Sequence, residues 1–306
     1  MMDNISKTPT PEENITTTQE TVPAPDVKKR RIVRGVILAV LLVILAFSTV
    51  MIIRYYRQQA EAAKAQAEIE DQFISKPEEQ PEVEPVTPPE DEQKDEPEEK
   101  PVAEDEEETK ESTPAAAVVF PSGNGGLTVD FDALCAAHPD VVGYIYCPGT
   151  NISYAVLYGK GNDYYLYHDI DGNYNDNGSI FVEEVNSSSF SDNNTILYGH
   201  HMKSGLMFAN LTLYKNSSFY PNHPCMYLYT PTQDYRIDLY AGFVCAHDDE
   251  VYATGLTQEQ LKAMAAKSTF TSAIDTPTGR TITMSTCSYE MPNGRYVVVG
   301  ELVPID

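Results

Sequence analysis

The feature that most constrains this chain is an almost unbroken apolar run over residues 36–53, with basic residues on both sides. Four consecutive basic residues at 28–31 and Arg34 precede the run, and Arg54 and Arg57 follow it. As an α-helix, about 18 residues span roughly 27 Å, and arginines that snorkel at the ends extend this toward the ~30 Å hydrocarbon core of a bilayer. The pattern predicts a basic flank and a single transmembrane helix within residues 28–57.

A cleaved signal peptide is the alternative, because it also has a basic front and an apolar middle. Here the apolar run begins only at residue 36 and ends in RYYR, without the small residues of a cleavage site, so an anchor is favoured. More positive charge precedes the run than follows it. The positive-inside rule then predicts a single-pass protein of the cell membrane, with a cytoplasmic N-terminus and an extracellular remainder.

The segments that flank the predicted anchor are polar. Residues 1–27 have no apolar periodicity and are predicted to be a disordered cytoplasmic tail. Residues 58–76 are rich in alanine and strong helix formers, which suggests a helical extension or, alternatively, a short coiled coil. Residues 77–114 hold 17 acidic side chains, three lysines and eight prolines, so residues 77–126 are predicted to form an extracellular stalk.

Residues 127–306 are predicted to be the globular part. A short helix is expected over residues 129–137, and helical interruptions are expected over 206–214 and 257–267. The remaining apolar runs are short, rich in Tyr, Val and Ile, and separated by turn residues: VVGYIYCPGTNISYAVLYG, GSIFVEEV, NNTILYGHH, CMYLYT, YRIDLYAGFVCAH, RTITMSTC and RYVVVGELV. This pattern predicts a mostly β, mostly antiparallel barrel or sandwich.

Charge and cysteine content exclude several classes of function. The net charge is −25, so a nucleic-acid partner is not expected, because its phosphates would be repelled. The five cysteines form no CxxC pair, and neither a metal site nor a cofactor motif emerges. Four cysteines lie in or beside apolar segments and are predicted core residues, although a disulfide between the first two stays open: Cys135, Cys147, Cys225 and Cys245.

The fifth cysteine, Cys287, ends an apolar run at residues 281–287, and Asn293-Gly294 lies just before Arg295 and a second run of valines. These runs predict a β-hairpin, whose antiparallel pairing brings Cys287 and Arg295 to one edge of the sheet. A cation beside a thiol favours a nucleophile or a site that binds an oxyanion. A buried cysteine with a purely structural role is equally compatible with the hairpin alone.

A nucleophilic cysteine needs a partner that transfers protons, and histidine is the usual one. His200 and His201 directly follow the run TILYG and therefore lie at the end of a predicted strand. Adjacent residues of an extended segment point to opposite faces, so only one of the two is expected to meet Cys287, and the pattern leaves open which. The other four histidines are interpreted as caps, turn residues or solvated residues: His138, His168, His223 and His247.

Taken together, TILYGHHM, LMFANLTLY, TITMSTC and Arg295 with its valine run resemble the sortase family. The stretch VVGYIYCPGTNISYAVLYGKGNDYYLYHDIDGNYNDNGSIF and the predicted helix over 257–267 are similar to class B sortases in particular, and the resemblance covers about residues 128–304. It implies an eight-stranded β-barrel that acts as a membrane-tethered cysteine transpeptidase without a cofactor. Its partners would be secreted proteins with a C-terminal sorting signal and an amine of the cell wall or of a peptidoglycan precursor.

The resemblance also implies roles for individual residues. Cys287 would be the nucleophile, His200 the proton carrier and Arg295 the oxyanion ligand. Less specific matches, for which packing is an equal alternative, are Ser285, Thr286, Tyr289 and Glu290, with His201 as a neighbour of the site. Three alternatives remain open at this stage: a pilin polymerase that uses a lysine amine, a cysteine peptidase that releases its product to water, and a non-catalytic binding scaffold.

Overall fold

The computed structural model describes residues 27–76, 118, 120–121 and 123–305. The predicted tail and almost all of the predicted stalk therefore lie outside the described residues. The chain divides into two compact units between Tyr55 and Tyr56.

The first described element is the α-helix α1 (Val27–Phe73), which contains the predicted transmembrane segment and residues 58–73 of the helical extension predicted over 58–76. The last residues of that prediction are not helical, because residues 74–75 form a strand. The sequence contains no Gly or Pro from residue 36 to residue 73, so no helix-breaking residue ends the helix earlier. The apolar side chains between residues 36 and 53 are exposed. By length and composition this part of α1 is able to cross a membrane, whereas its orientation stays a prediction.

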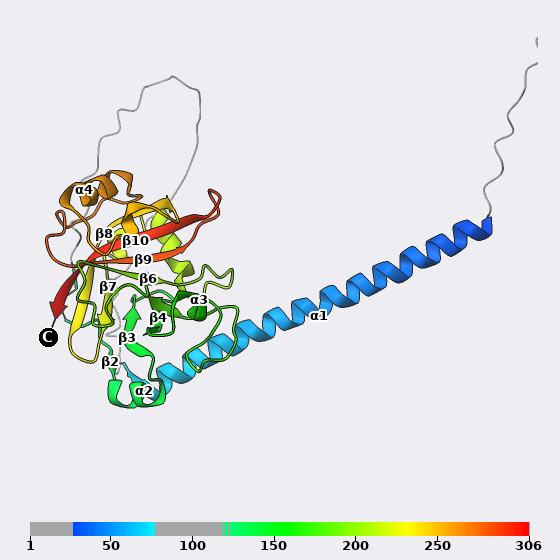
Figure 1. The fold of residues 1–306 in the computed structure, drawn as a ribbon, viewed down its shortest axis with the longest axis horizontal. Helices are drawn as coiled ribbons and strands as arrows, with labels where there is room; N and C mark the ends of the chain where they lie inside the picture. The colour runs from blue at the N-terminus through cyan, green and yellow to red at the C-terminus, as the bar shows by residue number, and fades with distance from the viewer. Residues whose placement is uncertain (1–26, 77–117, 119, 122, 306) are drawn as a thin grey trace, which may run out of the picture. The chain divides into compact units, whose positions relative to one another are not determined.

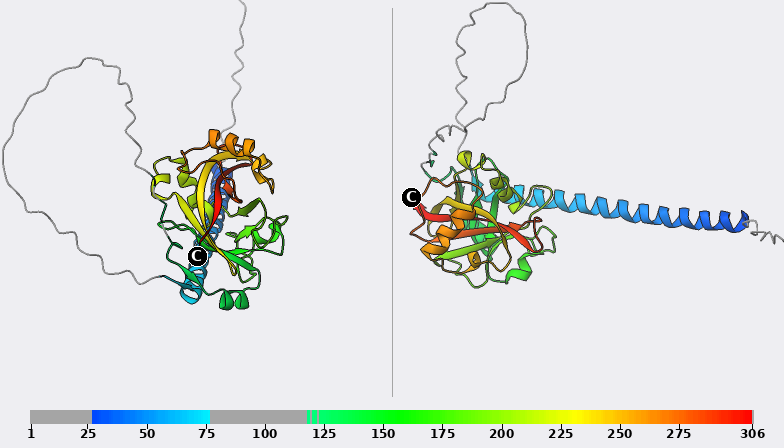
Figure 2. Two further views of the ribbon diagram at one scale, coloured as in Figure 1. Left: turned by 90° about the vertical axis from the view of Figure 1, so that its left-hand side faces the viewer. Right: turned by 90° about the horizontal axis from the view of Figure 1, so that it is seen from above.

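The second unit is built on a closed barrel of eight strands, which confirms the predicted fold class (Figures 1 and 2). The order around the barrel is β10-β8-β7-β3-β4-β5-β6-β9. The pairs β4–β5 and β6–β9 are parallel, and the other neighbours are antiparallel. The strands are β3 (Val141–Tyr146), β4 (Ser153–Leu157), β5 (Ile180–Val182), β6 (Asn194–Tyr198), β7 (Cys225–Tyr229), β8 (Asp234–Ala246), β9 (Thr281–Cys287) and β10 (Gly294–Ile305).

Alternating side chains fill the barrel on one face and pack under helices on the other. Met284 and Val298 belong to the interior cluster and are fully buried. On the outer face, Val297 packs with residues of the α-helix α4 (Gln258–Lys267), which lies against β8 (Figure 1). A capping box between Thr257 and Gln260 begins α4, so the predicted helix at 257–267 is confirmed.

The other predicted helices begin later than expected. The α-helix α2 (Phe131–Ala137) starts after Asp130, which accepts from the Ala133 N–H, because the preceding residues form the strand β2 (Thr128–Val129). The segment predicted at 206–214 is the 3₁₀-helix η1 (Phe208–Lys215), because Met207 has φ 57° and interrupts helical geometry. The remaining short elements are α3 (Asn162–Tyr165), η2 (Tyr220–Asn222) and η3 (Glu250–Tyr252).

The last turns of α1 belong to the same unit as the barrel. Ile69 is 7% exposed, in a cluster with residues of β3 and β4, and Gln66 donates to the Tyr144 hydroxyl at 3.2 Å. The strand β1 (Ile74–Ser75) then pairs with β2. A catalytic domain that begins at residue 127 stays a prediction, but the compact unit that contains the barrel begins at Tyr56.

Candidate active site

The hairpin β9–β10 places Cys287 directly opposite Arg295, as the sequence predicts. The Ser288 N–H donates to the Gly294 carbonyl at 2.9 Å, so Cys287 and Arg295 form a non-hydrogen-bonded pair, the kind whose side chains approach most closely. Asn293 supplies the turn with φ 54°, a conformation that asparagine tolerates. Both Cys287 and Arg295 are half-buried.

The second neighbour of β9 is β6, which brings the histidines to the same end of the barrel. Tyr198 is paired with Ser285, and the Gly199 N–H donates to the Ser285 carbonyl at 3.2 Å. A Cβ on Gly199 would meet the Ile180 side chain and lie 2.8 Å from the Phe208 ring, so no larger residue fits there. The φ of Gly199 is not positive, so the structural requirement for glycine at this position is close packing.

The His200 ring is oriented by a backbone carbonyl. Its Nε2 lies 2.8 Å from the Leu166 carbonyl oxygen. Because a carbonyl only accepts, Nε2 carries a hydrogen, and in the neutral ring Nδ1 keeps the lone pair. Nδ1 is therefore the nitrogen that is left to exchange a proton with a reacting group.

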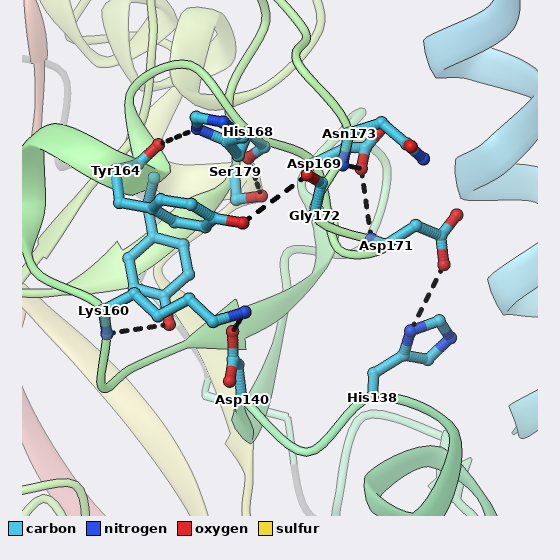
Figure 3. Close-up of polar contacts among 11 residues, drawn as sticks. His138, Asp140, Lys160, Tyr164, His168, Asp169, Asp171, Gly172, Asn173 and Ser179 are labelled. Carbon is cyan, nitrogen blue, oxygen red and sulfur yellow. Dashed lines mark hydrogen bonds and ion pairs between the residues drawn. The ribbon is translucent and has the colours of Figure 1, made fainter.

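The segment after Leu166 is held by its own polar contacts (Figure 3). His168 Nδ1 donates to the Tyr164 carbonyl at 2.8 Å, and Ser179 donates to the His168 carbonyl at 2.8 Å. Asp169 accepts from the N–H groups of Asp171 and Asn173 at 3.1 and 2.8 Å. These contacts limit the freedom of the backbone that presents Leu166 to His200.

His200, Cys287 and Arg295 line one cavity of about 170 Å³, together with Ser285 and Thr286. Its other lining residues are Asn162, Leu166, Phe181, Tyr198 and Gly199. Tyr198 donates to Glu183 at 2.8 Å, and Asn162 donates to the other oxygen of the same carboxylate at 2.8 Å. The residues around the cavity therefore include a cysteine, a histidine and an arginine, together with the hydrogen-bonded side chains of Tyr198 and Asn162.

His201 contacts the backbone of Cys287. Its Nδ1 lies 2.9 Å from the Cys287 carbonyl oxygen, while His200 lines the same cavity as Cys287. That only one of the two rings meets the Cys287 thiol stays a prediction.

The four less specific residues have distinct environments. Ser285 is buried and shares a 2.8 Å hydrogen bond with the Tyr252 hydroxyl, and Thr286 is buried on the alternate face of β9. Tyr289 is 77% exposed, with its ring centroid 5.5 Å from that of His201. Glu290 forms an ion pair with Lys215 at 3.1 Å. Both Tyr289 and Glu290 border a second hollow, of about 520 Å³, along residues 287–295.

Arg295 lies between two thiols, because Cys245 of β8 is its partner on the other side. Burial, reinforced by Asp249, raises the pKa of Cys245 to about 11. Burial also raises the pKa values of Tyr252 and Tyr198 well above the ordinary value for tyrosine. These neighbours are neutral at physiological pH, so they do not neutralise the guanidinium.

Cysteine and arginine also occur elsewhere in the unit that contains the barrel. All five cysteines are free, so the disulfide between Cys135 and Cys147 that the sequence left open is not formed. Arg236 binds Asp238, and Arg280 donates to the Phe190 carbonyl. Within the residues that the structure describes, no group of three or more His, Cys, Asp or Glu is arranged to hold a metal ion.

The sequence did not predict the residues that surround Cys287, His200 and Arg295. Leu166 contributes a backbone carbonyl, which is independent of its side chain and leaves no signal in the sequence. Asn162 lines the cavity, and Glu183 accepts its hydrogen bond from a separate segment, so only the closed barrel reveals that they are neighbours.

Comparisons with known proteins identify the family of the chain. The family model described as the sortase domain matches residues 145–303. Sortase B of Listeria monocytogenes is 34% identical over 188 residues, which cover 59% of this chain and 76% of the relative. Sortase B of Staphylococcus aureus is 31% identical over 183 residues, covering 57% and 75%. A solved Staphylococcus aureus sortase B-substrate complex superposes with a TM-score of 0.54 at 31% identity, covering 57% of this chain and 85% of that chain.

Proposed function

Because this chain belongs to the sortase family, among the class B sortases, we propose that it is a membrane-anchored cysteine transpeptidase that acts on secreted proteins with a C-terminal sorting signal. The observation that carries the proposal is the meeting of Cys287, His200 and Arg295 at one cavity. A relative of 31% identity has a solved structure described as a substrate complex, which supports a peptide substrate.

In the proposed reaction, Nδ1 of His200 takes the proton of the Cys287 thiol while the sulfur attacks the carbonyl carbon of the scissile peptide bond. The C–N bond breaks, the leaving amine takes this proton from Nδ1, and a thioester to Cys287 remains. An acceptor amine then gives a proton to Nδ1 and attacks the thioester, which forms a new amide, and the departing sulfur takes the proton from Nδ1 to become the thiol again. Arg295 stabilises the oxyanion in both steps through its fixed set of N–H donors.

We propose a peptidoglycan amine of the cell wall as the acceptor, with α1 anchoring the enzyme so that the barrel lies outside the cell. The positive-inside distribution of basic residues supports this orientation. In a Cys287→Ala background, a membrane-impermeant thiol reagent applied to intact cells should reach a cysteine placed in the barrel surface and not one placed in residues 1–27. The reverse labelling would overturn the orientation.

The reaction is tested with the full-length protein in detergent, a sorting-signal peptide and two amines in parallel, one of cell-wall type and one lysine-bearing peptide. Mass spectrometry should find a thioester on Cys287 and ligation to the cell-wall amine, while Cys287→Ala gives neither. Cys135→Ala is the matched control and should retain both products. Ligation to lysine alone would identify a pilin polymerase, and hydrolysis insensitive to amine would identify a peptidase. No adduct on the folded wild type would leave only a binding scaffold.

A further inference from the structure

The carbonyl of the candidate nucleophile lies where the barrel's hydrogen-bond ladder stops. On the β10 side, Cys287 belongs to a non-hydrogen-bonded pair, so its carbonyl points toward β6. On the β6 side, the last backbone hydrogen bond is donated by the Gly199 N–H to the Ser285 carbonyl. Parallel pairing advances two residues at each step, so the next bond would join the backbone N–H of residue 201 to the Cys287 carbonyl.

A side chain makes this bond in place of the backbone. His201 Nδ1 lies 2.9 Å from the Cys287 carbonyl oxygen, and a carbonyl accepts only, so Nδ1–H is the donor. We propose that His201 is a positioning residue, which continues the β6–β9 ladder through its ring and thereby fixes the backbone of Cys287. The proposal rests on the proposed function for its effect on turnover, but the fixed backbone is measurable without it.

The backbone that carries the His201 ring is itself held in place. Residue 201 forms an isolated antiparallel bridge with Met207, whose N–H donates to the Tyr154 hydroxyl at 2.9 Å. The Phe208 N–H donates to the His200 carbonyl at 3.0 Å, which closes the same loop. The Tyr289 ring lies 5.5 Å from the His201 ring. A donor held in this way restrains its acceptor, because neither partner moves freely.

The restraint matters for the proposed chemistry because Cys287 is the last residue of β9. Without a donor to its carbonyl, the strand end is held on the β10 side alone. A displacement of about 1 Å at a reacting centre costs up to roughly a hundredfold in rate. The role requires an N–H at one place and no proton transfer, which separates it from the role proposed for His200.

Three substitutions of His201 distinguish its role as a hydrogen-bond donor from a role in proton transfer. Asn presents an N–H₂ group on the atom that corresponds to Nδ1, Asp has the same shape without a donor at neutral pH, and Leu fills space without polarity. In full-length protein, we expect His201→Asn to form the Cys287 thioester within about threefold of the wild-type rate and with an unchanged pH profile. His201→Asp and His201→Leu should lose about ten- to a hundredfold in that rate, with the KM for the sorting peptide changed less than threefold. His247→Asp, at an exposed histidine, is the control for a new acidic residue.

Amide hydrogen exchange tests the restraint independently of activity. The Ser288 N–H, bonded to the Gly294 carbonyl, should exchange faster in His201→Leu and at the wild-type rate in His201→Asn. If the Asn variant matches Leu in both rate and exchange, the proposal is wrong, and so it is if all three variants behave as wild type. If wild type forms no thioester, the proposed function fails, and the exchange result alone decides the role of His201. A variant that unfolds, as shown by its Tm, is set aside, and the Asn and Leu pair decides.

Discussion

At the scale of residues, the site depends on a row of three side chains across adjacent strands. Cys245, Arg295 and Cys287 are register partners in β8, β10 and β9. The two thiols differ in exposure, because Cys245 is 5% exposed and Cys287 is half-buried and borders two hollows. Only Cys287 is open to a substrate, although both lie beside the same guanidinium.

Replacing Arg295 with lysine should lower the rate of thioester formation by about a hundredfold while leaving Tm nearly unchanged. Lysine keeps the charge but cannot present several donors in a plane. In the wild type, Nη1 of Arg295 also donates to the Asn293 and Gly294 carbonyls at 3.3 and 3.0 Å. Stopped-flow or quenched assays of the thioester measure the rate, and thermal unfolding measures the stability. Full activity in the lysine variant would show that a point charge is sufficient.

Alkylation should separate Cys287 from the other four cysteines. Burial raises the pKa values of Cys147 and Cys225 to about 11 each, as it does for Cys245, and Cys135 is shifted upward by burial and by Asp132. Iodoacetamide at pH 7.5 is therefore expected to add one group to the folded protein and none to Cys287→Ala, as read by intact mass. Modification of Cys135 before Cys287 would contradict this order.

At the scale of elements, the sequence patterns predicted the structures that form between segments close together in the chain. The β9–β10 hairpin, the position of α4 and the juxtaposition of Cys287 and Arg295 follow from alternation and turn residues, and all are observed. The parallel β6–β9 pair was not predicted, because it joins segments far apart in sequence with no turn between them. The contact of His201 with a carbonyl and that of His200 with Leu166 depend on this pair, so they too were beyond the sequence.

The docking of the end of α1 on the barrel was also missed, because the alanine-rich segment resembles a simple extension of the membrane helix. Gln59 donates to Asn177 at 2.8 Å and accepts from Ser204 at 2.7 Å, and Ser204 follows the two histidines closely in sequence. The end of α1 therefore contacts the loop that follows the two histidines.

Replacing Ile69 with alanine should lower the free energy of unfolding by about 2 kcal/mol, because Ile69 is buried between α1 and the barrel. For a unit of this size that corresponds to a fall in Tm of roughly 4–8 °C. Lys64→Ala, on an exposed side of the same helix, is the matched control and should change Tm little. Equal Tm values for the two variants would show that the helix contributes nothing to the barrel.

At the scale of the whole molecule, ionisable groups that are buried in their neutral form make the free energy of unfolding depend on pH in the alkaline range. The Cys147 pKa is raised to about 11 by burial, from an ordinary value near 9. The unfolded chain therefore loses this proton at lower pH than the folded protein does. The contribution is fully present below pH 9 and is lost as the pH rises through about 11.

We expect the free energy of unfolding to be flat from pH 7 to 8.5 and to fall from pH 9 to 11, with Cys147 alone responsible for about 2–3 kcal/mol. Cys147→Ala should be less stable at pH 7, because it leaves a cavity, but its loss between pH 9 and 11 should be smaller by that amount. Thermal unfolding across the pH series measures both curves. Parallel curves would show that Cys147 does not titrate differently in the two states.

The closed order of the strands also determines when the candidate site can form during synthesis of the chain. β9 lies between β6 and β10, so the final two strands in sequence close the barrel. Contacts between distant segments form late, because the chain between them must first be brought together. During synthesis from the N-terminus, His200 is made long before Cys287 and Arg295, and a chain that ends before residue 295 lacks at least one of the three. A nascent chain shorter than this therefore cannot attack its neighbours through an assembled site.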